Sequence, residues 1–131
     1  MTNSIDTTYN GWTNRETWLV GVWDFFDLDH VRQALANIIN GDAGTDSEIN
    51  ADIVKMSGLK RAVTVALAKW LENDHEDTLD DRMGLGKLAE KGGDWGYLID
   101  HINTSLWGIN WLEIAEHYEE EIKEALAKSS E

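Results

Sequence analysis

Apolar residues recur at helical spacings along most of the chain. The clearest stripe covers 59–71, where the steps between apolar positions alternate between three residues and one. This spacing keeps the side chains on one face of a helix and does not fit a strand, in which every second residue faces the same way. Further stripes follow residue 13, cover 31–39, 49–56 and 95–102, and end the chain over 111–126. The pattern predicts an all-α protein in which five or six helices pack as one compact bundle.

Polar residues at the edges of these stripes predict where the first helices begin and end. Thr13, with Glu16 three residues later, has the form of a capping box and predicts the start of the first helix. Asp27 or Asp29 is expected to cap the second helix, because a carboxylate can accept hydrogen bonds from the free N–H groups of a first turn. Gly41 is expected to end that helix.

The later boundaries are predicted in the same way. Asp46 or Ser47 is expected to open a short third helix, and the Ser-Gly pair at 57–58 is expected to interrupt it. Asp94 is expected to cap the helix that carries the stripe over 95–102. Asn110, with a glutamate three residues later, resembles another capping arrangement and predicts the start of the last helix.

Two segments lack an apolar face. Residues 1–12 are polar and are expected to form an N-terminal arm, which Tyr9 and Trp12 anchor to the rest of the domain. Residues 72–86 contain few side chains that a core would bury, and their first ten positions hold six acids and no base. This second segment predicts an exposed acidic loop. The whole chain, residues 1–131, is expected to form a single helical domain.

Composition removes several kinds of chemistry. The chain has no cysteine, which excludes a disulfide framework, a thiolate zinc site and a thiol nucleophile, and makes an intracellular location the default. The N-terminus has neither a basic region nor an apolar run, and no segment is long and apolar enough to cross a bilayer. A cytoplasmic protein without membrane contact is expected.

The seven tryptophans are expected to be mainly structural. Trp12 and Trp107 lie beside glycines at helix boundaries, where we favour packing across a neighbouring helix end over exposure as a binding anchor. Five others occupy apolar helical faces and are expected in the core: Trp18, Trp23, Trp70, Trp95 and Trp111.

Candidate catalytic and metal-binding residues are few. His75 lies among acids, but no register of 72–83 fits a calcium loop with its glycine at the sixth position and its glutamate at the twelfth. His117 has Glu113 and Glu121 one turn away on either side, which is one histidine with surface glutamates. The chain has no phosphate-binding loop and no nucleophile elbow. We expect no enzyme activity, no metal and no cofactor.

Charge is the strongest functional signal. The chain has 25 acidic and 11 basic side chains, a net charge of −14, which disfavours direct binding of nucleic acid and favours a basic protein partner. Solubility or adaptation to high salt would account for the same acidity. Three groups of acids are the candidate partner-binding residues: Asp24, Asp27 and Asp29; Glu72, Asp74, Glu76, Asp77, Asp80 and Asp81; and Glu113, Glu116, Glu119, Glu120, Glu121 and Glu124.

Two tryptophan-bearing segments carry a resemblance to known proteins. Tyr9-Asn10-Gly11-Trp12-Thr13-Asn14-Arg15-Glu16-Thr17-Trp18, with Trp23 after it, resembles a motif near the start of small proteins encoded by phages, plasmids and other mobile elements, whose function is largely unassigned. The segment Ile109-Asn110-Trp111-Leu112-Glu113-Ile114-Ala115 is similar to their C-terminal part. Both segments are predicted helix starts, and we expect them to pack together and close the bundle.

The resemblance implies a biological context. Small acidic helical phage proteins are similar in kind to DNA-mimic inhibitors of restriction or CRISPR defence. The leading hypothesis is therefore an inhibitor that binds a basic nucleic-acid-binding surface of a host defence complex. The alternatives are an acidic accessory or interaction domain, a homodimer with an exposed apolar patch, and a metal-binding enzyme of unrecognised type.

Overall fold

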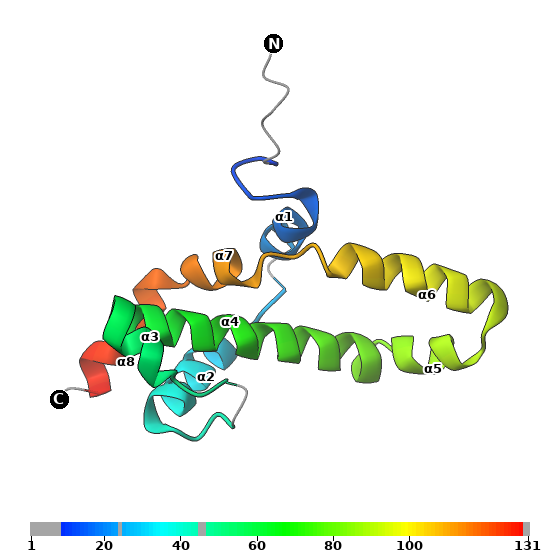
Figure 1. Ribbon diagram of the computed structural model, residues 1–131. Helices are drawn as coiled ribbons and strands as arrows, with labels where there is room; N and C mark the ends of the chain where they lie inside the picture. Colours follow the sequence, from blue (N-terminus) through cyan, green and yellow to red (C-terminus); the bar gives the residue numbers. More distant parts are fainter. Residues whose placement is uncertain (1–8, 24, 45–46, 130–131) are drawn as a thin grey trace, which may run out of the picture.

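The fold consists of helices packed around one long central helix. The computed structural model describes residues 9–23, 25–44 and 47–129. Within these ranges it has eight α-helices and a π-helical turn: α1 (Arg15–Val22), α2 (Leu28–Asn40), α3 (Ala51–Ser57), α4 (Leu59–Asp77), η2 (Thr78–Arg82), α5 (Leu85–Glu90), α6 (Gly93–Leu106), α7 (Trp111–Glu116) and α8 (Glu119–Ser129) (Figure 1). No helix in these ranges has the length and apolar content needed to span a membrane.

The all-helical prediction is confirmed, whereas the predicted number of five or six helices is wrong. The stripe over 111–126 does not form one helix, because the chain turns at His117 and Tyr118 and divides it into α7 and α8. Residues 85–90 form the short helix α5, and most of the predicted loop before them is helical as well. An apolar stripe predicts which face is buried, but it does not show where the backbone turns.

The helix α4 lies at the centre of the core and packs against α2, α3, α7 and α8. Its face carries Val63, Leu67 and Leu71, which are fully buried, as the spacing predicts. The facing helices supply their own apolar stripes, and the largest buried side chains among them are Val31, Leu35, Ile38 and Ile122. Burial of such side chains contributes about 1.5–3 kcal/mol each, so this contact is the main source of stability.

The predicted acidic loop over 72–86 is wrong. The helix α4 continues to Asp77, η2 follows directly, and α5 begins at Leu85. The buried face continues with it, because His75 and Thr78 are buried beyond Leu71 while most of the acids face solvent. Figure 1 shows α5 and α6 running side by side as an antiparallel arm that extends beyond the core.

Helix capping follows the predictions in part. Asp27 caps α2 by accepting a hydrogen bond from the N–H of Asp29, and Gly41 ends the helix in the left-handed conformation, as predicted. The cap of α3 is Asn50 and not Ser47, which lies buried upstream; Asp46 lies outside the described residues. Asp94 does not cap α6, since that helix begins at Gly93 without a side-chain cap.

The start of α1 also differs from the prediction. Its cap is Asn14, one residue after the expected Thr13, and the Asn14 side chain accepts from the N–H of Thr17. The segment before it is a tight turn in which Tyr9 and Trp12 exchange two backbone hydrogen bonds, 2.7 and 2.9 Å long. Asn10 and Gly11 both have positive φ, 49° and 88°, as the Asn-Gly pair of a type I′ turn requires.

The turn places the ring of Trp12 between α1 and the C-terminal end of α7. Its indole stacks on His117 with ring centroids 4.0 Å apart. The other neighbour is Gly21, where an added Cβ would lie only 2.7 Å from the indole. The absence of a side chain at Gly21 therefore permits this close approach.

The caps of α1 and α7 interlock, so the two segments predicted to pack together do so. Asn14 donates from Nδ2 to the carbonyl of Gly108 at 2.6 Å. The hydroxyl of Thr17, which is fully buried, donates to Asn14 Oδ1 and accepts from the N–H of Asn110 at 2.9 Å. Asn110 in turn caps α7 by accepting from the N–H of Glu113. Asn14 and Asn110 thus each accept a hydrogen bond from the first turn of their own helix and also hydrogen-bond to the other segment.

We predict that Thr17→Val lowers the free energy of unfolding by about 1–3 kcal/mol, because the N–H of Asn110 would lose its acceptor. The matched control is Thr64→Val. Thr64 is also buried, but its hydroxyl donates only to the Lys60 carbonyl one turn earlier in α4. Urea unfolding followed by tryptophan fluorescence measures both variants. Equal losses would contradict a special role for Thr17.

Candidate functional site

The three predicted acidic groups differ in how many of their carboxylates form hydrogen bonds or ion pairs within the chain. In the first group, Asp27 is occupied as the cap of α2, and Asp29 pairs with Arg32 at 3.4 Å. Asp24 lies outside the described residues. The carboxylates described at this helix start therefore already have partners within α2.

The C-terminal acidic group is extensively paired. Glu113 accepts a hydrogen bond from the N–H of Thr13 at 2.9 Å. The ion pairs join α7 and α8 to α4 or lie within α8: Glu116 with Arg61 at 3.0 Å, Glu119 with Lys60 and with Lys123, and Glu120 with Lys123 at 3.8 Å. Glu116 and Glu119 thus help attach the C-terminal helices to α4, although exposed pairs of this kind contribute little energy individually.

The pairing of Glu119 affects its ionisation. A hydrogen bond from the Lys60 ammonium holds the pKa of Glu119 below its ordinary value, and the charge of Lys123 adds to the effect. This carboxylate therefore stays charged while it remains engaged with two lysines.

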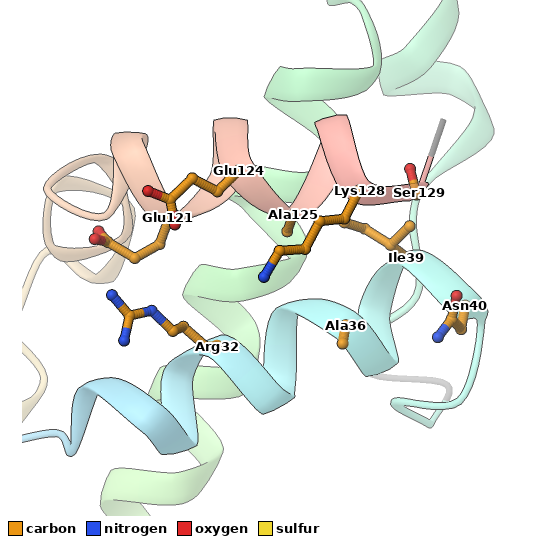
Figure 2. Close-up of a pocket in the computed structure, with 9 residues that line it drawn as sticks. All are labelled: Arg32, Ala36, Ile39, Asn40, Glu121, Glu124, Ala125, Lys128 and Ser129. Atoms are coloured by element: carbon orange, nitrogen blue, oxygen red, sulfur yellow. The ribbon is translucent and has the colours of Figure 1, made fainter. Parts of the chain in front are cut away.

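The remaining acids of α8 lie along a hollow of mixed charge. Glu121 and Glu124 line a pocket between α8 and α2 together with Arg32 and Lys128. Figure 2 shows the Arg32 guanidinium extending toward Glu121 and the Lys128 side chain extending into the same gap. Both signs of charge face this hollow, so it does not present an uncompensated negative surface.

The acids of α4 and η2 are much less compensated. Glu72 pairs with Lys69 at 3.3 Å. Within the described part of the chain, the other five members of the group form no ion pair: Asp74, Glu76, Asp77, Asp80 and Asp81. Of the three predicted groups, this one therefore offers the most negative charge to a partner.

The helical conformation divides this group between two surfaces. Glu72, Glu76 and Asp80, at steps of four residues, line one hollow. Asp74 and Asp77 line a different pocket beside Ala43 and Gly44. Four residues of α-helix advance about 6 Å, so Glu72 and Glu76 form part of a row along the axis. A loop, as predicted, would impose no such order.

The hollow that contains this row is here called the acidic groove. It lies between α4, η2 and α5 on one side and the end of α6 and the start of α7 on the other. Glu72, Glu76 and Asp80 line the first side, and Leu106, Trp107 and Trp111 line the second. The Trp107 side chain is 85% exposed, so its indole is available at the edge of the groove. Carboxylates and an accessible aromatic ring therefore occur at one site.

Three predictions about tryptophan are wrong. Trp107 was expected to pack across a helix end, and Trp23 and Trp95 were expected in the core, but all three are exposed, Trp23 by 77%. Trp23 and Trp107 are the C-caps of α1 and α6. The helix ends there, so the apolar face predicted from the spacing does not continue to these side chains. Four tryptophans are half-buried: Trp12, Trp18, Trp70 and Trp111.

His75 lies at the inner side of the acidic groove and is only 7% exposed. Its ring contacts Phe25 and Trp111, with centroids 4.7 and 5.0 Å away. Burial in these aromatic surroundings lowers the pKa of His75 from 6.5, and the nearby charge of Asp74 opposes the shift in part. The imidazole is therefore neutral at pH 7.

The arrangement around His75 does not suit a metal ion. Among the described residues, no three histidine or acidic side chains come together as a metal site would require. The nearest rings come from Phe25 and Trp111, which offer no ligand atoms suited to a divalent cation.

The sequence contained a signal for this site that the loop prediction missed. Leu67, Leu71, His75 and Leu79 follow one another at four-residue steps, which continues the stripe of α4 through the acidic segment. Following that register would have predicted a helix with His75 on its inner face. The position of α6 across the groove has no comparable local signal.

The chain matches no family model, no curated protein and no solved structure. Its function must therefore be inferred from its own residues and their arrangement.

We predict that His75 makes the fold less stable below about pH 6.5. Because burial lowers the pKa of His75 in the folded state, the unfolded chain takes up a proton more readily. The stability that the neutral imidazole contributes is therefore complete above the ordinary pKa of 6.5, and it is lost as the pH falls toward the lowered folded-state pKa. Urea unfolding between about pH 5 and 7.5 should show a shallower dependence in His75→Phe. The matched control, His101→Gln, removes an exposed imidazole from α6. The same change in both variants would contradict the assignment to His75.

Proposed function

We propose that this protein binds the basic nucleic-acid-binding surface of another protein and thereby excludes the nucleic acid. The observation that carries the proposal is the run of carboxylates on α4 and η2 that no cation of the described residues pairs with, above all Glu76, Asp77, Asp80 and Asp81. A surface that binds phosphates presents lysine and arginine side chains, which such carboxylates can engage in their place.

The helical frame supports this proposal. Carboxylates on a continuous helix keep their spacing before the partner arrives, so binding costs less conformational entropy than it would for an acidic loop. The net charge of −14 speeds the approach to a basic surface and disfavours contact with nucleic acid itself.

We further propose the biological setting of this activity. The resemblance of the segment around Trp12 to proteins of phages and plasmids supports an inhibitor of host restriction or CRISPR defence that acts in the host cytoplasm. In this reading the protein is not an enzyme and requires no cofactor, because a charged surface alone suffices to compete with a phosphate backbone.

A second candidate function is supported by the exposed aromatic residues. Trp23 and Trp107 expose most of their side chains, and Leu19, Val20 and Phe25 line a hollow next to Trp23. Exposed tryptophans are typical anchors of protein interfaces. An interaction domain or homodimer that uses this apolar surface, without mimicry of nucleic acid, is the alternative.

We predict that neutralising four unpaired carboxylates of α4 and η2 weakens competition with DNA by at least about tenfold. The variant is Glu76→Gln, Asp77→Asn, Asp80→Asn and Asp81→Asn together. The assay captures the partner from a bacterial lysate with tagged wild-type protein and then measures displacement of labelled DNA from that partner at several salt concentrations. The wild-type competition should weaken as salt rises, because ions screen the charges.

The control for this experiment removes the same number of charges from the C-terminal acidic group: Glu116→Gln, Glu119→Gln, Glu120→Gln and Glu124→Gln. Its competition should fall much less, since most of these carboxylates already engage lysine or arginine. Equal losses in the two variants would show that net charge alone matters. If both variants compete as well as the wild type and salt has no effect, binding through the apolar surface is favoured instead.

A further inference from the structure

We propose that the acidic groove binds an arginine side chain of the basic partner, with its guanidinium beside Glu76 and Asp80 and its plane against Trp107. This inference rests on the proposed function and names the chemistry by which the partner is recognised. Three independent features of the groove carry it: its carboxylates, its exposed indole and its buried imidazole.

The carboxylates supply the charge. Glu76 and Asp80 lie one turn apart on the same side of the groove and form no ion pair with any described residue. A guanidinium has five N–H donors in a planar fork, so it can bridge two carboxylates that an ammonium would contact only as a point charge. Glu72 adds negative charge at the end of the row, although Lys69 engages it in part.

The indole supplies a surface for the rest of the side chain. Trp107 is 85% exposed and lies across the groove from the acidic row. Arginine stacks on such a ring through its planar, weakly hydrated head and its apolar stem. A cation beside an indole already occurs elsewhere in the described chain, since the ammonium of Lys91 lies 5.8 Å from the ring centroid of Trp95, although an ammonium lacks the planar head that stacks.

The third feature of the groove is the buried imidazole of His75. His75 is nine-tenths buried and borders the groove, yet its ring nitrogens have no hydrogen-bond partner among the described residues. A buried polar group is ordinarily satisfied, and one that is not calls for a ligand or a solvent molecule. A neutral imidazole offers one acceptor nitrogen, which an N–H of the incoming guanidinium can satisfy.

The charge of the groove disfavours a second copy of this chain as the occupant. Two copies would bring a net charge of −14 each to one contact, and the acidic row would meet another strongly negative protein. Like charges placed together in this way are destabilising. A cationic segment of a different protein fits the same groove without that penalty.

The test uses the complete protein and a short synthetic peptide of alternating arginine and glycine, with a lysine peptide of the same length as the comparison. Calorimetric titration should show about tenfold weaker binding of the arginine peptide to Trp107→Ala, and a similar loss for Glu76→Gln with Asp80→Asn. The matched controls are Trp23→Ala and Glu120→Gln with Glu124→Gln, which remove an exposed indole and two acids elsewhere. These controls should bind as the wild type does. The ring resonances of His75 should shift when the peptide binds.

Several outcomes would overturn the inference. Equal effects of the groove variants and their controls would show that the peptide binds the acidic surface at large, and the proposed competition with nucleic acid would then stand without the groove. Equal affinity for arginine and lysine peptides, or no binding of the arginine peptide, would exclude recognition through a stacked guanidinium. Loss of DNA competition is measured separately, so a failure of the proposed function is distinguishable. Thermal unfolding confirms that the variants fold.

Discussion

The buried face of α4 extends from Ala62 into η2 without a break, and the rest of the molecule depends on this continuity. Four helices pack against α4, and beyond Leu71 the buried face consists of His75 and Thr78. A helix with one side buried must present its remaining residues outward at fixed angles. The acids after Leu71 therefore become ordered rows. The same constraint that completes the core thus arranges the charges of the proposed site.

The interlocked caps of α1 and α7 define the other side of the groove. Asn14 holds the carbonyl of Gly108, the residue directly after Trp107, and Thr17 holds the N–H of Asn110. These bonds fix the backbone where α6 ends, and they connect residues more than ninety positions apart in the sequence. The Asn14 cap, which in the sequence is only a local helix start, therefore also makes long-range hydrogen bonds. These bonds position the exposed indole of Trp107 relative to the acids of α4.

Negative charge has different roles in different parts of this protein. Carboxylates of α7 and α8 engage Lys60 and Arg61 and join the last helices to α4. Those of η2 have no such partners within the described ranges, so their mutual repulsion is not relieved inside the chain. A surface that keeps this repulsion is costly for stability and suited to a cationic partner. The distinction between the groups lies in their neighbours, because all of them are carboxylates.

The sequence by itself determined the elements whose cause is local. Spacing identified the buried faces of α2 and α4, Asp27 and Gly41 marked the ends of α2, and the absence of cysteine removed whole classes of chemistry. Local rules work there because a cap or a stripe acts within one or two turns. Tertiary structure alone decided which carboxylates pair with cations of another helix, which tryptophans are exposed, and where α6 meets the acidic row. Those properties depend on neighbours brought together from distant parts of the chain, and no local pattern records them.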